Sequence, residues 1–267
     1  MAPVVTKASD LDVLYEAFDV NTHEFMYTAF TLIDEDDIFY YGQLNIAKLE
    51  ITFEQFTSAL QRLPDEDILP EVPSDATLTV APDKLELGKD AYYIKRPRVT
   101  EYEDYKNDDC LSIISLLLLE EAQALQLASL GPHPGIIRYH GCHVRRGRIT
   151  GLVLDRHEYD LKGYLRENVG HIDKEVFMAA LESAVRHLHS MGLAHNDINP
   201  RNILINAAGM PVLVDFGSCR KVGEKLGSTR GTPGWVEGPM EEYTTSEERH
   251  DTFAIGKIRD WLDNPTF

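Results

Sequence analysis

A polar stretch at residues 195–202 combines residue types that can do chemistry. It reads HNDINPRN, so Asp197 follows a histidine by two positions and Asn202 follows Asp197 by five. A DFG triplet begins further on with Asp215. Magnesium takes oxygen ligands, and phosphoryl transfer needs magnesium between phosphate oxygens and a carboxylate near the attacking hydroxyl. We therefore interpret Asp197 as that carboxylate, and Asn202 and Asp215 as metal ligands.

A lysine and an acid upstream could complete such a site. Lys95 lies in the apolar stretch AYYIKR, which Pro97 ends, so it is expected on a short strand. In this position it could contact phosphates, steadied by a glutamate on the following helix. That helix offers Glu120 and Glu121. We favour Glu121, because Leu125 follows it by four positions and would face inward, but the spacing leaves both open.

The elements around the polar stretch follow from hydrophobic periodicity and capping. A helix is predicted over 173–192, with Asp173 as N-cap and Gly192 as its stop. A hairpin is predicted over 203–216, so the polar stretch lies between helix and hairpin. Upstream we expect a strand, a long apolar helix and two further strands, at residues 91–96, 109–130, 135–142 and 149–155.

The N-terminal region also reads as folded. Residues 22–33 and 37–44 are rich in aromatic and β-branched residues and predict two strands joined by the acidic turn DEDD. A helix over 52–63 begins with a capping box of Thr52 and Gln55. The proline-rich stretch that follows, to residue 83, reads as a linker.

Composition limits the possible functions. Of 267 residues, 43% are hydrophobic and 26% charged, as in globular proteins. The net charge is −18, and residues 1–75 carry 16 acidic and 3 basic residues, which disfavours nucleic-acid binding. The longest apolar run, 111–119, is about half of the roughly 20 residues of a membrane span. With no signal peptide and three scattered cysteines, we expect an intracellular protein, cytoplasmic or nuclear, with no membrane partner.

Motifs in a fixed order carry a family resemblance. From about residue 85 to 260 the chain resembles the protein-kinase superfamily, and it is similar to small fungal kinase-like proteins that share the wording YIKRP, RGRITGLVLDR and HND. The motifs, in chain order, are YYIK, LLEEAQAL, GPHPGIIRYHG, LVLDRHEYDL, LAHNDINPRNILI, VLVDFG, GTPGW and DTFAIG.

The resemblance implies a fold and cofactors. It implies an α+β, bilobal protein-kinase-like fold with a truncated C-lobe and an acidic N-terminal extension. The extension would span residues 1–75 and pack on an N-lobe of 76–155, and the short C-lobe would span 156–267. The implied cofactors are ATP and Mg²⁺.

The resemblance also implies individual roles. Lys95 would bind phosphate and be catalytic together with Asp197 and Asn202. Leu154 would be the gatekeeper, and Asp155 to His157 the hinge that meets adenine through backbone groups. Two further roles are structural: Asp251 would brace the loop backbone, and His195 would pack beneath Phe216.

The chain departs from the family pattern at several positions. The only glycine near Lys95 in the place of a phosphate-covering loop is Gly88. Asn196 replaces an arginine and has no charge to pair with a phosphorylated segment. Asn199 replaces a lysine, so it offers no cation to the phosphoryl group. The stretch GTPGWVEGPMEE lacks the usual Ala-Pro-Glu ending, and the last C-lobe helices are not in the sequence.

Three functions compete. The leading one is a serine/threonine-type protein kinase, since GTPGW resembles that form of the activation segment. The alternatives are a pseudokinase that binds without turnover and a kinase of small molecules. The hydroxyl substrate is thus a protein or a small molecule, and a monomer is expected. For residues 1–75, a structural cover is preferred over autoinhibition.

Overall fold

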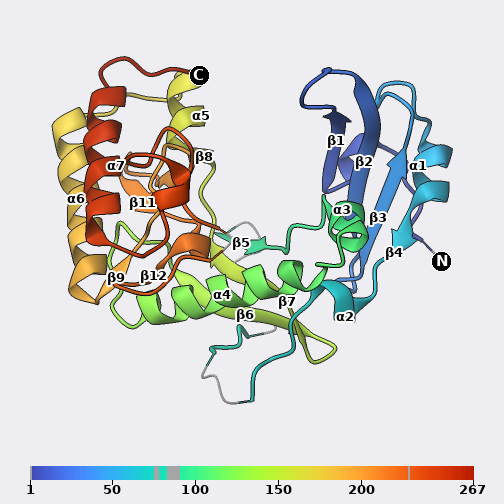
Figure 1. Cartoon of the computed structure of the whole chain (residues 1–267), viewed down its shortest axis with the longest axis horizontal. Coiled ribbons are helices and arrows are strands. Elements are labelled where there is room, and N and C mark those ends of the chain that lie inside the picture. The colour runs from blue at the N-terminus through green and yellow to red at the C-terminus, as the bar shows by residue number, and fades with distance from the viewer. Residues whose placement is uncertain (1, 75–77, 83–90, 228) are drawn as a thin grey trace. The chain divides into compact units, whose positions relative to one another are not determined.

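The computed structural model describes residues 2–74, 78–82, 91–227 and 229–267, which belong to two compact units (Figure 1). Unit 1 comprises Met1–Ser74, Arg96–Leu118 and Val144–Gly151; unit 2 comprises Asp75–Lys95, Leu119–His143 and Leu152–Phe267. Unit 1 thus joins the N-terminal region to two segments of the predicted N-lobe. The three predicted domain boundaries stay a prediction. The expected glycine-loop position, with Gly88, lies outside the described residues.

Unit 1 is built on a four-stranded antiparallel sheet. Its strands follow chain order: β1 (Val13–Phe18), β2 (Phe25–Ile33), β3 (Phe39–Leu44) and β4 (Gln61–Arg62). The two predicted strands are confirmed, and β1 was not predicted. The helix expected over 52–63 is shorter: α1 (Phe53–Ala59) has the predicted capping box, but Leu60 is extended. The chain leaves the helix there because the next two residues pair with β3 as β4.

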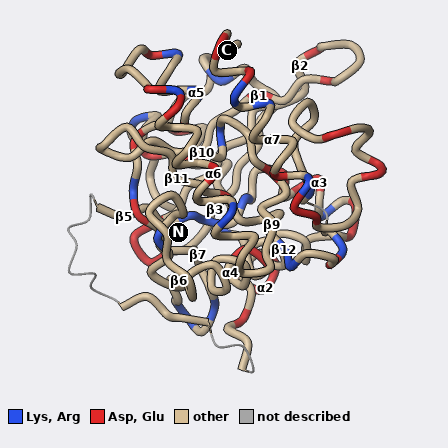
Figure 2. The backbone as a smooth tube through the Cα atoms, turned by 90° about the vertical axis from the view of Figure 1, so that its left-hand side faces the viewer, with Lys and Arg blue, Asp and Glu red and all other residues tan. Residues whose placement is uncertain are grey.

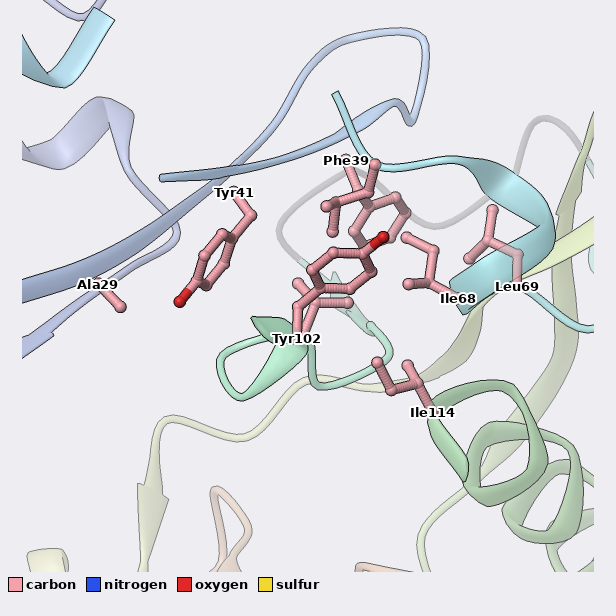
Figure 3. Packing of buried hydrophobic residues seen from close by; sticks show 9 residues of the cluster. Ala29, Phe39, Tyr41, Ile68, Leu69, Tyr102 and Ile114 are labelled. Carbon is pink, nitrogen blue, oxygen red and sulfur yellow. The ribbon is translucent and has the colours of Figure 1, made fainter. Parts of the chain in front are cut away.

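Both faces of this sheet are covered by apolar side chains. One face packs with α1, where Phe30 and Phe56 meet edge to face at 4.7 Å between ring centroids. The other face forms the cluster in Figure 3 with α2 (Asp65–Ile68), α3 (Tyr102–Asn107) and the start of α4 (Ser112–Ser129). Its buried members are Ala29, Phe39, Tyr41, Leu63, Ile68, Leu69, Val99, Tyr102 and Ile114. The N-terminal region therefore shares a core with residues from the predicted N-lobe.

Charged contacts tie the same segments of unit 1 together. The turn before β3 places Asp37 against the guanidinium of Arg96. Arg146 donates to a carboxylate oxygen of Asp65 at 2.6 Å and to the backbone oxygens of Asp36 and Asp37 at 2.5 and 2.9 Å. Acidic and basic positions also lie side by side around α3 (Figure 2). Part of the excess acid of residues 1–75 is thus neutralised within the unit.

The β-structure of unit 2 begins with a three-stranded sheet in the order β5-β7-β6. Its strands are β5 (Tyr92–Lys95), β6 (Tyr139–Arg145) and β7 (Arg148–Asp155). The strand expected over 135–142 starts later, because Ile137 donates instead to the backbone of Leu213 at 3.0 Å. Helix α4 and the β6–β7 hairpin each continue from one unit into the other.

The rest of unit 2 is mainly helical. Helix α6 (Lys174–Ser190) confirms the predicted helix, with Asp173 accepting from the amide of Val176 at 3.2 Å as its N-cap. The predicted hairpin is β10 (Ile203–Ile205) and β11 (Pro211–Leu213). The remaining elements are β8 (Tyr159–Asp160), α5 (Leu161–Arg166), β9 (Leu193–Ala194), β12 (Arg220–Lys221) and α7 (Glu248–Trp261), with short 3-10 helices at Ala8–Asp10, Phe216–Ser218 and Met240–Glu242. None of the described helices is both long and apolar enough to cross a membrane.

Candidate active site

The polar loop of residues 195–202 connects β9 to β10, and its hydrogen bonds converge on Asp197. The side-chain nitrogen of Asn202 donates to the backbone oxygen of Asp197 at 2.9 Å and to its Oδ2 at 3.0 Å. Oδ1 accepts from Asn199 at 3.1 Å and from the hydroxyl of Thr232 at 2.7 Å. Three neutral donors therefore fix the orientation of the carboxylate that we predicted to meet the hydroxyl.

A buried aspartate on α7, Asp251, accepts hydrogen bonds from the backbone of this loop. Asp251 is fully buried, and its two oxygens accept from the backbone amides of His195 and Asn196, each at 2.8 Å. His195 is also fully buried, lies 5.2 Å from the ring of Phe216 and pairs with the backbone oxygen of Val214 at 2.9 Å. The geometry matches the structural roles expected for Asp251 and His195.

A second cluster joins the predicted lysine to both predicted acids. The ammonium of Lys95 lies 2.7 Å from Glu121 and 2.9 Å from Asp215. Oε1 of Glu121 also accepts from the backbone amide of Phe216 at 3.1 Å. Helix α4 contributes Glu121, β5 contributes Lys95, and Asp215 follows β11. The choice between two glutamates is thereby settled in geometry, because Glu120 pairs with Arg220 instead.

Asp215 has a backbone conformation that few residues adopt. Its φ and ψ of 62° and 73° lie in the left-handed region, which is strained for most residues other than glycine, although asparagine and aspartate adopt it more readily. Such strain persists only where surrounding contacts hold it, and it concentrates at functional sites. The contacts here are the Lys95 ion pair and the 3-10 helix that begins at Phe216.

The charges of this cluster follow from burial and pairing. Burial alone would lower the pKa of Lys95, but Glu121 and Asp215 raise it above its ordinary value, so the ammonium stays charged. Burial would raise the pKa of Asp215, yet the charge and hydrogen bond of Lys95 hold it below its usual range. Burial raises the pKa of Asp197, although hydrogen bonds from Thr232 and Asn199 oppose the shift. Asp215 is therefore the more acidic of the two aspartates.

A cavity of about 420 Å³ opens beside these residues within unit 2. Ligand pockets commonly have volumes of about 300–1,000 Å³. Its lining brings together the predicted site residues Lys95, Leu154, Asp155, His157, Asn202 and Asp215, with Tyr93, Ile137, Arg156, Arg201, Leu204 and Val214. Asp197 and Glu121 are not in this lining; they contact it through Asn202 and Lys95. The wall thus combines apolar side chains with a few convergent charged groups.

The predicted hinge is already bonded within the protein at two of its residues. The amide of Asp155 donates to the backbone oxygen of Arg138, and that of Arg156 to Ala91, both at 3.1 Å. The carboxylate of Asp155 pairs with His140 at 2.7 Å. Neither of those two amides is therefore free for a base, and contact with adenine through the backbone stays a prediction.

The residues expected to hold magnesium form a small set of oxygen donors. Among residues 2–74, 78–82, 91–227 and 229–267, no group of three or more His, Cys, Asp and Glu side chains could hold a metal ion. Mg²⁺ in nucleotide sites usually takes one or two carboxylates, with waters and substrate phosphates completing its shell. Asp215 is ionised, and Asn202 uses its amide nitrogen on Asp197, which leaves its oxygen for a cation. This donor set fits magnesium held jointly with a nucleotide.

Sequence reasoning missed two residues that contact this site. Thr232 donates to Asp197 across 35 positions of chain, and Arg220 joins Glu120 to the backbone oxygens of Gly217 and Cys219. Thr232 lies in the GTPGW motif, but no local spacing relates it to Asp197. The motif alone could have indicated that Thr232 contacts the loop, but not that it bonds the carboxylate of Asp197.

A comparison with known protein families identifies the family of this chain. The family model described as "Protein kinase domain" matches residues 92–259. That is more than half of the chain, so the chain belongs to the protein kinase domain family. The predicted recognition and the α+β kinase-like fold class are therefore confirmed, and the chain is a protein kinase-like phosphotransferase domain by family.

The curated relatives match at low identity. Myosin-IIIa of Mus musculus is 32% identical over 160 residues, covering 51% of this chain and 10% of that protein. Mitogen-activated protein kinase kinase kinase 5 of Arabidopsis thaliana is 27% identical, covering 57% and 21%. Serine/threonine-protein kinase/endoribonuclease IRE2 of Homo sapiens is 32% identical, covering 45% and 14%. The chain thus spans about a tenth to a fifth of the length of these relatives.

A solved structure is also similar. The kinase PK-1 of Cydia pomonella granulovirus matches with a TM-score of 0.45 and 20% sequence identity, covering 55% of each chain.

Proposed function

We propose that this protein transfers the γ-phosphoryl group of Mg-ATP to a serine or threonine hydroxyl of a protein. The observation that carries the proposal is the joint placement of Lys95, Glu121 and Asp215 beside the loop of Asp197 and Asn202. These are the groups that phosphoryl transfer uses to hold phosphates, metal and hydroxyl. Relatives described as serine/threonine-protein kinases support the acceptor class.

Each residue has a part in the proposed reaction. Lys95, held by two carboxylates, binds phosphate oxygens as a fixed point charge. Asp215 and Asn202 hold the metal, which when bound neutralises charge on the transferred group. Asp197 accepts a hydrogen bond from the attacking hydroxyl and orients it. Its raised pKa, caused mainly by burial, brings it nearer the range of a proton acceptor.

Position 199 is an asparagine and not a lysine, but other basic side chains line the cavity. Asn199 donates to Asp197 at 3.1 Å and to Thr232 at 3.2 Å, so it acts through hydrogen bonds alone. Besides Lys95, the guanidinium-bearing residues Arg156 and Arg201 line the cavity. Either can place positive charge near a triphosphate, which supports nucleotide binding in this cavity.

Melting experiments with nucleotide and metal test the proposal. A ligand that binds only the folded state stabilises it by about 2.7 kcal/mol at a hundredfold excess over Kd. The melting temperature should rise clearly with millimolar ATP and Mg²⁺ together, and little with either alone. Asp215→Ala should abolish that rise, whereas Asp260→Ala, which removes an exposed acid from α7, should keep it.

Transfer is measured with the same protein and labelled ATP. Label should appear on serine or threonine of a generic protein acceptor. Mg-ATP binding without transfer to any acceptor would leave the pseudokinase alternative, and transfer to small hydroxyl compounds alone would favour the small-molecule kinase. No rise in melting temperature with Mg-ATP would defeat the phosphotransferase proposal.

A further inference from the structure

Asn196, immediately before Asp197, is an almost fully buried polar residue. Its side chain and backbone together are 1% exposed, and its φ is 62°. Asparagine adopts this left-handed conformation more readily than most residues other than glycine. It lies within the loop that carries the candidate base and contacts Asp251 and His250 of α7.

The side-chain amide nitrogen of Asn196 bonds to both ends of the segment 218–246. It donates to the backbone oxygen of Ala194 at 2.8 Å, at the end of β9. It also donates to the backbone oxygen of Ser218 at 3.1 Å, just after the DFG triplet, and to the hydroxyl of Ser246 at 2.9 Å, just before α7. Ser218 and Ser246 mark the two ends of the segment 218–246, and both are buried.

The oxygen atoms of Asn196 are used as well. Its side-chain oxygen accepts from the amide of Glu247 at 3.3 Å and lies 3.2 Å from Nδ1 of His250. Its backbone oxygen accepts from the hydroxyl of Tyr243 at 2.9 Å. An aspartate would lose both amide donors and would place a second charge beside Asp251, which accepts from the amide of Asn196. The neutral amide is thus the side chain that these partners require.

The segment 218–246 matters because it carries Thr232. This threonine donates to Asp197 at 2.7 Å and accepts from Asn199 at 3.2 Å. Its position depends on how the two ends of the segment are held. Asn196 therefore connects three features through bonds that it makes itself: the loop, the segment and the start of α7.

We propose that Asn196 is a positioning residue for phosphoryl transfer, which holds the segment 218–246 so that Thr232 keeps Asp197 oriented toward the hydroxyl. The inference rests on the proposed function. The bonds of its side chain run to backbone atoms, a serine hydroxyl and an imidazole, so holding the segment through them needs no charge at position 196. Asn196 is not among the residues that line the cavity, so we expect its effect on kcat and not on nucleotide binding.

Two variants separate side-chain bonds from backbone conformation. Asn196→Asp keeps the size and loses both donors, and Asn196→Gly keeps the left-handed backbone accessible and loses every side-chain bond. For both we expect kcat to fall about 10- to 100-fold, as small misplacements of reacting groups do. The rise in melting temperature with Mg-ATP should stay as in the wild type. Trypsin should cleave faster after the exposed Lys221 and Lys225.

A stability control and a milder variant complete the test. Val185→Ala shortens a buried side chain of α6, outside the loop and the segment 218–246, and should lower the melting temperature without changing kcat. Ser246→Ala removes one partner of Asn196 and should lower kcat in the same direction by a smaller factor. Unchanged kcat and unchanged cleavage in the folded Asn196 and Ser246 variants, with only a lower melting temperature, would overturn the proposal. If wild-type protein binds no Mg-ATP, the proposed function fails, and unchanged trypsin cleavage would then overturn the role of Asn196 separately.

Discussion

At the scale of single residues, Asp197 is held by three neutral side chains rather than by a cation. Thr232, Asn199 and Asn202 all donate to its carboxylate. Neutral hydrogen-bond donors orient a carboxylate and still leave it able to accept a hydrogen bond from a substrate. The site therefore depends on geometry at this position more than on charge pairing.

Replacement of the carboxylate tests this role directly. Asp197→Asn keeps the size of the side chain and removes the acceptor charge, and it should lower kcat about 10²- to 10⁴-fold. Single-turnover transfer measures this loss. The melting temperature, with and without Mg-ATP, is the control and should stay close to that of the wild type. Wild-type turnover in this variant would show that Asp197 is not the group that meets the hydroxyl.

The threonine contact predicts a pH effect with a definite sign. The hydrogen bond from Thr232 lowers the pKa of Asp197, whereas burial raises it. Thr232→Val removes the lowering contribution, so the folded-state pKa rises and the carboxylate is lost at a higher pH. The acidic limb of the kcat–pH profile should therefore move to higher pH in this variant. Thr252→Val on α7, which removes an exposed hydroxyl bonded to Glu248, should leave the limb in place.

At the scale of elements, helix α4 presents two consecutive carboxylates to different partners. Glu121 is buried on Lys95 and the amide of Phe216, and Glu120 pairs with Arg220. Arg220 in turn donates to the backbone oxygens of Gly217 and Cys219. One turn of helix thus contacts the DFG triplet directly at Phe216 and, through Arg220, at Gly217.

A double-mutant cycle measures the outer of these two pairs. Exposed ion pairs contribute about 0.2–1 kcal/mol, but the side chains of Arg220 and Glu120 are only 14% and 26% exposed. We expect Glu120→Gln and Arg220→Gln to couple by about 1 kcal/mol in denaturant unfolding. The more exposed pair of Lys174 and Asp263 is the matched control and should couple near zero. Equal coupling in both pairs would remove any special role for Arg220.

At the scale of the whole molecule, residues 1–74 are part of a shared core. The cluster around Ile68 combines them with Val99, Tyr102 and Ile114 from later segments. Tyr102 also donates to a carboxylate oxygen of Asp67 at 2.8 Å. Residues of the acidic region therefore contribute side chains to the core of unit 1, and their role as a structural cover stays a prediction.

Removal of that region should cost stability. Deletion of residues 1–63 uncovers Val99, Tyr102 and Ile114, and we expect poor solubility or a much lower melting temperature. In the full chain, Ile68→Ala should cost about 2–5 kcal/mol of unfolding free energy, because the side chain is fully buried. A soluble deletion variant with wild-type melting and strongly raised transfer would support autoinhibition instead.

Local signals explain which features could be predicted from sequence. Asp173 capping α6, the hairpin after residue 202 and the spacing within 195–202 all act over a few residues, and each is found in the structure. Strand β1 was missed because its inner residues are all half-buried, so no alternation marks it. The contact between Thr232 and Asp197 could not be read, because a tertiary arrangement and not a local spacing creates it.

The composition of unit 1 from three separate stretches has a consequence for biosynthesis. Arg146 donates to the backbone of Asp36, which precedes it by 110 positions. During translation at about 5–20 residues per second, the sheet β1–β4 is exposed for on the order of ten seconds before that arginine is made. One apolar face of the sheet stays uncovered until α3 and the start of α4 are made, and the polar contacts of Arg146 form later still. Chaperone binding to nascent chains is therefore expected to concentrate on chains that end between β4 and residue 151.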